Sequence, residues 1–139
     1  MKPLVIVIHG LDHARAALSA AAELEQGITL MSAPNACAYG GPAWFEHVIA
    51  LTEAEIPGVL VKSVLDCGSS PGLALGAIRQ GAENIRVEVS PKLRHKIADI
   101  AKTSDATLFN SPIKALDLNQ VADPLQACRD WLAKNISKK

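Results

Sequence analysis

The sequence alternates between short segments rich in apolar residues and longer segments whose apolar positions recur with the period of a helix. The first run, residues 4–8, is continuous, which is typical of a strand that is buried on both faces. This alternation predicts an α/β fold, a single three-layer domain over residues 1–139 with a mostly parallel five-stranded sheet. The other four strands are predicted at residues 28–31, 59–65, 85–89 and 106–109.

Capping residues predict where the intervening helices begin and end. Asp12 is expected to cap the first helix, because a short carboxylate accepts hydrogen bonds from the free amides of a first turn. Gly27 is expected to end that helix, since glycine readily takes a positive φ. Pro42 is placed as the first residue of a second helix that runs to about Glu55. The remaining helices are predicted to begin at Pro71, Pro91 and Pro124, each close to a serine or aspartate.

The order of the strands in the sheet stays open. A flavodoxin-like order places the binding crevice between the first and third strands, whereas a Rossmann-like order places it between the first and fourth. The pattern is also ambiguous from residue 110 to Val121, where no element is assigned. The sequence therefore predicts which segments form strands but not which strands are neighbours.

Polar residues follow every predicted strand at its carboxyl end, the edge at which open parallel sheets bind ligands. His9 is the most distinctive, because capping a helix does not require histidine; it can be a general base, a ligand or a hydrogen-bonded histidine at the sheet edge. The candidate catalytic residues are His9, Asp66 and Cys67, and the candidate ligand-binding residues are Gly10, Asn35, Gly68, Ser69, Ser70 and Gly72. At the last two predicted strands the polar residues are Glu88, near the end of its strand, and Ser90, Asn110 and Ser111, which follow.

The segment 68–72, Gly-Ser-Ser-Pro-Gly, has the G-x-S-x-G spacing of a nucleophile elbow. The partners of a serine nucleophile stand in the wrong order, because His95 precedes Asp99 and Asp105. The backbone amides of this segment, at the start of a predicted helix, instead favour a phosphate or carboxylate. We therefore predict an anion site here.

The three cysteines do not have the pattern of a disulfide framework. They are odd in number and lack a C-x-x-C pair, which argues against disulfides and a zinc cluster. Cys67 is either a thiolate assisted by His9 or a small buried hydrophobe.

Metal-binding residue types occur near the first strand and in the later turn: His9, Asp12, His13 and Asp66. His9 and His13 do not share a helical face, so no metal is predicted. Nucleotide-binding glycine motifs are absent, and no cofactor is predicted.

Composition narrows the possible partners. The chain has 139 residues, 14 basic and 14 acidic, so its formal net charge of zero argues against a nucleic-acid partner. No apolar stretch approaches the roughly 18 residues of a membrane span, and no signal peptide is recognised. We expect a cytoplasmic protein with no membrane partner.

Only 20% of the residues are charged, and the predicted helices are rich in alanine. Gly72 and Gly76 are unfavourable inside a helix unless it packs closely against the sheet or another subunit, so we expect a homo-oligomer. Residues 92–96 carry a basic cluster that is either a solvated face or a contact for an acidic partner. The predicted function is binding of a small anionic metabolite or phosphate group, with or without catalysis. The alternative is a noncatalytic oligomerising or protein-interaction module.

Overall fold

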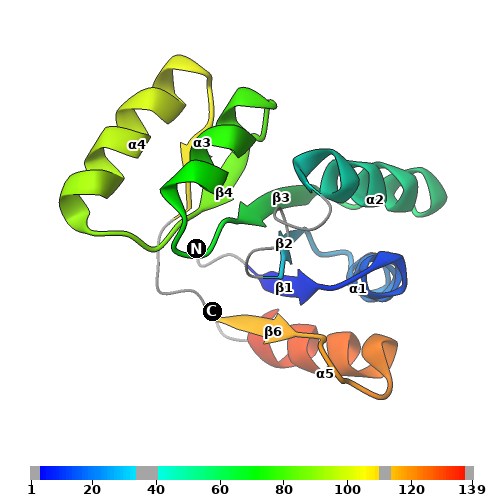
Figure 1. The fold of residues 1–139 in the computed structure, drawn as a ribbon. Coiled ribbons are helices and arrows are strands. Elements are labelled where there is room, and N and C mark those ends of the chain that lie inside the picture. Colours follow the sequence, from blue (N-terminus) through cyan, green and yellow to red (C-terminus); the bar gives the residue numbers. More distant parts are fainter. Residues whose placement is uncertain (1–3, 34–40, 110–113, 137–139) are drawn as a thin grey trace. The chain divides into compact units, whose positions relative to one another are not determined.

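The computed structural model describes residues 4–33, 41–109 and 114–136 (Figure 1). Strands and helices alternate along the chain, and the predicted α/β class with a mostly parallel sheet is confirmed. The strands are β1 (Val5–Ile8), β2 (Ile28–Ser32), β3 (Val61–Asp66), β4 (Asn84–Arg86), β5 (Thr107–Leu108) and β6 (Ala115–Asp117). The helices are α1 (Leu11–Glu23), α2 (Gly41–Glu55), α3 (Pro71–Arg79), α4 (Pro91–Thr103) and α5 (Pro124–Ile136).

The strand order in the sheet is β5-β4-β3-β2-β1-β6, which matches neither of the two orders considered from the sequence. The pairings of β1 with β6, β3 with β4 and β4 with β5 are parallel. The described residues contain six strands instead of the predicted five, because β6 lies in the stretch whose pattern was ambiguous. This strand has only three residues, none of them fully buried, so it lacks the apolar run that predicts the others.

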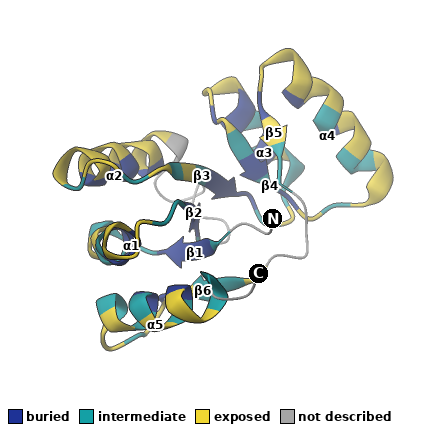
Figure 2. Cartoon of the chain, turned by 180° about the vertical axis from the view of Figure 1, so that it is seen from behind, coloured by how far each residue is buried: buried dark blue, intermediate teal, exposed yellow. Residues whose placement is uncertain are grey.

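The chain divides into two compact units. The first contains residues 1–31, 47–62 and 114–139, and the second contains residues 32–46 and 63–113. In the first unit every residue of β1 is buried, and α1 packs against α5 (Figure 2). Its core is almost entirely aliphatic, as the low aromatic content predicts. The largest fully buried side chains of this unit include Ile6, Ile8, Leu18, Leu30, Leu118 and Leu132.

The second unit is built on β3, β4 and β5, with α3 packed against α4. Val64 and Ile85 are buried in the strands, and Ile97 lies on the buried face of α4. Ile100 follows Ile97 at helical spacing, but 46% of it is exposed, so it does not belong to that buried face.

Serine caps begin two helices as predicted. The Ser70 hydroxyl accepts a hydrogen bond from the Leu73 amide at 3.1 Å, and the Ser90 hydroxyl accepts one from the Leu93 amide at 3.4 Å. In both helices a proline follows the cap, where its missing N–H has no consequence. Cap chemistry therefore located these helix starts correctly.

The predicted ends of α1 need correction. The cap residue is Gly10, which has no side chain to accept a hydrogen bond, and Asp12 lies inside the first turn. At the other end Glu25, with φ of 51°, occupies the left-handed conformation that was assigned to Gly27. The helix ends at Glu23, four residues before that glycine, and the amides of Glu25 and Gln26 close the last turn onto the carbonyls of Ala22 and Ala21.

Helix α2 agrees with its predicted range, and its buried residues include Phe45, Val48, Ile49 and Thr52. The glycines of α3 do not have the expected close approach within the described residues. A Cβ at Gly76 would meet nothing within 4 Å, and one at Gly72 would meet only the Ser70 hydroxyl at 3.9 Å. The prediction that these glycines allow α3 to pack closely on the sheet is therefore wrong.

Among the described residues, no helix has the length and apolar character that crossing a bilayer requires.

Candidate functional site

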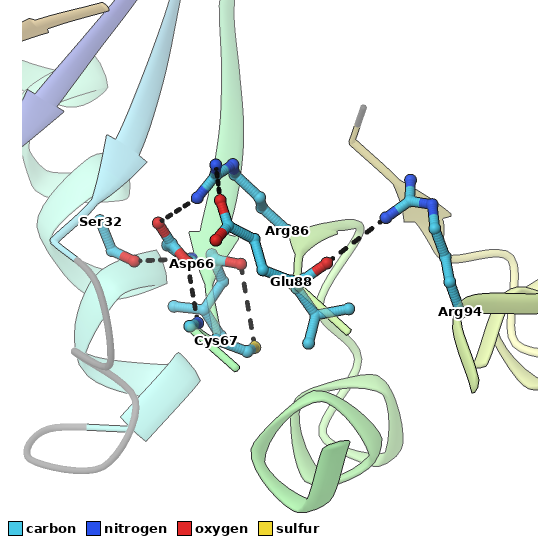
Figure 3. A network of polar contacts seen from close by, with 9 residues as sticks. Ser32, Asp66, Cys67, Arg86, Glu88 and Arg94 are labelled. Atoms are coloured by element: carbon cyan, nitrogen blue, oxygen red, sulfur yellow. Dashed lines mark hydrogen bonds and ion pairs between the residues drawn. The ribbon is translucent and has the colours of Figure 1, made fainter. Parts of the chain in front are cut away.

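In the second unit, Asp66 is a buried carboxylate at the carboxyl end of β3. Its Oδ1 accepts a hydrogen bond from the Gly68 amide at 2.8 Å, and its Oδ2 accepts one from Arg86 Nη1 at 3.2 Å (Figure 3). Its own amide donates to the Ser32 hydroxyl at 2.9 Å. Because both oxygens are bonded and only 2% of the side chain is exposed, Asp66 anchors the neighbouring groups.

Arg86 lies between two carboxylates at the carboxyl end of β4. Its Nη1 faces the buried Asp66, and its Nη2 forms an ion pair with Glu88. The Arg86 side chain is 16% exposed, whereas that of Glu88 is 60% exposed. Within the described residues the buried Nε of Arg86 has no hydrogen-bond partner, and leaving such a group unpaired costs about 1–3 kcal/mol. The guanidinium is thus fixed from the inside and paired with an exposed carboxylate on the outside.

The turn that joins β3 to α3 is tied to the end of β4. Gly68 has a φ of 60°, the left-handed conformation that glycine adopts without strain. The Cys67 amide donates to the Arg86 carbonyl at 2.8 Å, and the Glu88 amide donates to the Gly68 carbonyl at 2.7 Å. These bonds hold the predicted anion-binding turn beside Arg86 and Glu88.

The turn uses some of its own donors and leaves others available. The Gly68 amide is bonded to Asp66, and the Ser70 amide donates to the carbonyl of Cys67 at 3.3 Å. Ser69 and Gly72 are exposed, and in the described part of the chain neither of their amides has a hydrogen-bond partner. Fewer backbone amides of this turn are therefore available to a ligand than the sequence predicted.

Cys67, a candidate catalytic residue, is completely buried. Its thiol lies 3.9 Å from the Leu65 carbonyl, a weak contact inside the core. This is the environment of a small buried hydrophobe, which the sequence had left as one of two alternatives.

The basic cluster at the start of α4 is not one uniform surface. Arg94 reaches back to the carbonyls of Val87 and Phe109, at 3.4 Å each, so its guanidinium supports the sheet edge. His95 is 81% exposed, with its Nε2 3.9 Å from Asp99 Oδ2. Only part of the cluster is therefore a solvated face.

A second polar cluster lies in the first unit, at the carboxyl ends of β1 and β6. His9 directly follows β1, and Asp117 ends β6 opposite Val7 in the parallel register. His9 Nε2 lies 2.6 Å from Asp117 Oδ1, and the His9 amide donates to Nδ1 of His13 at 3.0 Å. The Asn119 amide also donates to Asp117 Oδ1, at 2.9 Å. The two imidazole rings meet edge to face, with centroids 5.6 Å apart.

The surroundings shift two pKa values in this cluster. Burial and the neighbouring His9 lower the pKa of His13, and this outweighs the opposite effect of Asp12 and Asp117. Burial raises the pKa of Asp117, but the hydrogen bonds from the Asn119 amide and His9 prevail and lower it. His13 is consequently held in its neutral form and Asp117 in its charged form.

The structure places the candidate residues in two groups. His9 and Gly10 belong to the first unit, while Asp66, Cys67 and the segment 68–72 belong to the second. Asn35, Asn110 and Ser111 lie outside the described residues. Over residues 4–33, 41–109 and 114–136, no group of three or more His, Cys, Asp or Glu side chains is arranged to hold a metal ion.

Sequence reasoning missed two members of these clusters. Arg86 was treated only as part of a strand, although a charged residue inside a short apolar run is a signal that a buried partner exists. Asp117 lies in β6, so it could not be placed at the sheet edge before that strand was known. The contact of His9 with His13 was not predicted either: the absence of a shared helical face argued only against a metal site, whereas the contact is made by the His9 backbone amide.

No family model matches the chain. Over 85 residues it is 26% identical to a fructose-bisphosphate aldolase from Xanthobacter flavus. This similarity covers 61% of the present chain and 24% of the aldolase, so the chain spans only a small part of that relative's length.

Proposed function

We propose that the chain binds a small phosphorylated metabolite at the turn between β3 and α3, beside Arg86. The observation that carries the proposal is the pairing of Arg86 with the exposed Glu88 carboxylate. A guanidinium that is fixed on one side by Asp66 presents its other side as a planar donor for an oxyanion. Glu88 then occupies the position that the ligand's phosphate takes.

Displacing Glu88 requires little free energy. Its side chain is 60% exposed, and exposed ion pairs contribute about 0–1 kcal/mol. A phosphate group carries more negative charge than a carboxylate and offers three acceptor oxygens. Asp66 stays in place, because it is buried and also bonded to the Gly68 amide.

The turn supplies further donors for the same ligand. The Ser69 and Gly72 amides lie at the start of α3, whose first turn contains no acidic residue. The dipole of a helix favours an anion at this end. The similarity to the aldolase supports a phosphorylated ligand, because that protein's name refers to a phosphorylated sugar.

Isothermal titration with inorganic phosphate and with fructose 1,6-bisphosphate tests the proposal. Arg86→Lys keeps a cation beside Asp66 but loses the planar fork, and we expect it to weaken binding about tenfold. Arg15→Lys is the matched control, since Arg15 pairs with the half-exposed Glu55 in the first unit and should not affect affinity. Binding that is absent at millimolar concentration, or equally weakened by both variants, contradicts the proposal.

Glu88→Gln separates the proposed site from a general electrostatic effect. Removing this carboxylate frees Arg86 Nη2, so phosphate affinity should rise by about three- to tenfold. Glu83→Gln removes an exposed charge one residue before β4 and serves as the control. An equal rise in both variants assigns the change to net charge and counts against the site.

We further propose self-association as a second function, on the observation that 84% of Leu60 is exposed. Leu60 lines a hollow of about 380 Å³ in the first unit, together with Gly27, Pro57 and Val59. An apolar side chain this exposed beside a hollow favours burial against a second copy of the chain. Light scattering on the wild type and Leu60→Ser tests this, with a dimer expected only for the wild type. A monomeric wild type contradicts it.

We also propose a cytoplasmic location. Cys128 is a buried thiol that forms no disulfide, which fits a reducing compartment. Fractionation of cells that express the tagged full-length protein tests this; recovery in a membrane or secreted fraction contradicts it.

A further inference from the structure

The first unit contains an imidazole pair at the carboxyl ends of β1 and β6 that the phosphate site does not use. We propose that His9, positioned by Asp117 and assisted by His13, is the general base of a hydrolytic centre for small uncharged esters. This proposal is independent of phosphate binding, because all three residues belong to the first unit.

The hydrogen bonds determine which nitrogen of each ring is free. His13 Nδ1 accepts a hydrogen bond from the His9 amide, so the neutral His13 ring carries its own proton on Nε2. His9 Nε2 faces the Asp117 carboxylate and is therefore the protonated nitrogen of the neutral ring, which leaves Nδ1 as an acceptor. Among the described residues, neither His9 Nδ1 nor His13 Nε2 has a hydrogen-bond partner. The pair thus presents one free acceptor and one free donor.

The two rings are close enough to serve one small substrate. Their centroids lie 5.6 Å apart, and 27% of the His9 side chain is exposed, so water and a small ligand reach it. Asp117 is itself held by the Asn119 amide, which fixes the carboxylate that orients His9. A base that is oriented by a fixed carboxylate is the arrangement that general-base catalysis requires.

Local charge selects the class of substrate. The negative charges of Asp12 and Asp117 both interact electrostatically with His13. Arg15 lies 3.6 Å from Asp12 but is also bound to Glu55, so the carboxylates near this centre outnumber the cation. An anionic substrate is disfavoured here, whereas an uncharged carbonyl compound is not.

The proposed reaction consumes one water and one ester. His9 Nδ1 takes a proton from the water as its oxygen bonds to the ester carbon, and the carbonyl π electrons move to oxygen. That oxygen accepts a hydrogen bond from His13 Nε2. When the intermediate collapses, the bond to the alkoxy group breaks, the leaving oxygen takes the proton from His9, and acid and alcohol depart. His9 and His13 are the catalytic residues, and Asp117 is a positioning residue.

Hydrolysis of p-nitrophenyl acetate by the full chain provides the test. His9→Gln preserves a side-chain N–H toward Asp117 but removes the base, so the rate above background should fall about 100-fold or more. Asp117→Asn should lower kcat while leaving KM unchanged, because it disturbs the orientation of the base and not the binding of the ester. Thermal unfolding of each variant verifies that it is folded.

His95→Gln is the matched control, because His95 and Asp99 form another histidine–aspartate pair that is exposed and loosely placed at 3.9 Å. Its rate should equal that of the wild type. The wild type should also react more slowly in D2O, since a proton moves in the rate-limiting step, and this measurement needs no variant. Equal rates for wild type, His9→Gln and unfolded chain, or equal rates in water and D2O, overturn the proposal.

Discussion

Arg86 Nη1 donates to Asp66 Oδ2 at 3.2 Å and so joins the carboxyl ends of two paired strands, β3 and β4. Asp66→Ala leaves the guanidinium, only 16% exposed, without its inner partner, so the free energy of unfolding should fall by about 3 kcal/mol. Glu88→Ala removes the exposed partner and should change it by less than about 1 kcal/mol. Urea denaturation measures both values. Similar losses of unfolding free energy in the two variants would contradict the stronger stabilising role assigned to Asp66.

The left-handed conformation of Glu25 is a site where glycine should stabilise the protein. With φ of 51° just after α1, Glu25 is strained as a residue that carries a Cβ. Glu25→Gly should raise the free energy of unfolding by about 0.5–1 kcal/mol. The same change at the exposed helical Glu53 should lower it by about 1 kcal/mol. Thermal or urea unfolding compares the two, and effects of the same sign would be inconsistent with the assigned conformation.

His13 should have a pKa below the ordinary value of 6.5, because burial and the neighbouring His9 disfavour its protonated form. Asp117→Asn should lower this pKa further, since the Asp117 charge raises it, and His9→Gln should raise it. Because the pKa of His13 is lower in the folded chain than in the unfolded one, its contribution to stability is present above pH 6.5 and is lost as the pH falls. NMR titration of the imidazole Cε1 protons measures these shifts. A His13 pKa above 6.5 in the wild type would refute them.

Burial raises the pKa of the Cys128 thiol to about 11 from an ordinary value of 9.0. The thiol should therefore react with iodoacetamide at pH 8 much more slowly in the native chain than in urea. Between pH 9 and 11 the unfolded chain releases this proton first, so the free energy of unfolding should fall by about 1–3 kcal/mol. Cys128→Ala should remove that part of the decline. Identical pH profiles for wild type and variant would show that the thiol does not contribute.

Much of the architecture could be predicted because local pattern determines it. Short segments rich in apolar residues located the first five strands, and the caps Ser70 and Ser90 located two helix starts. Strand order could not be predicted, because pairing depends on contacts between segments far apart in the chain. The short strand β6 was missed for the related reason that it is held by its pairing with β1 and not by its own composition.

The candidate sites were predictable only in part. Asp66 and His9 were expected at the carboxyl ends of strands, where the structure has them: Asp66 is the last residue of β3 and His9 directly follows β1. The end of an apolar run can be read directly from the sequence. Their partners Arg86 and Asp117 could not be paired with them, since each lies on a neighbouring strand. Burial also distinguishes two candidates from the same turn: Ser69, a candidate ligand-binding residue, is exposed, whereas Cys67, a candidate catalytic residue, is fully buried.

The most direct test of the central claim is an NMR titration of the ¹⁵N-labelled chain with inorganic phosphate. If phosphate binds beside Arg86, the largest amide shifts should fall at Ser69, Gly72 and Glu88, and the Arg86 Nε–H signal should shift with the same dissociation constant. The amides around His9 should not move in step with them. Shifts that are largest outside the segment 68–72 and residues 86–88, or that are absent at millimolar phosphate, would contradict the claim.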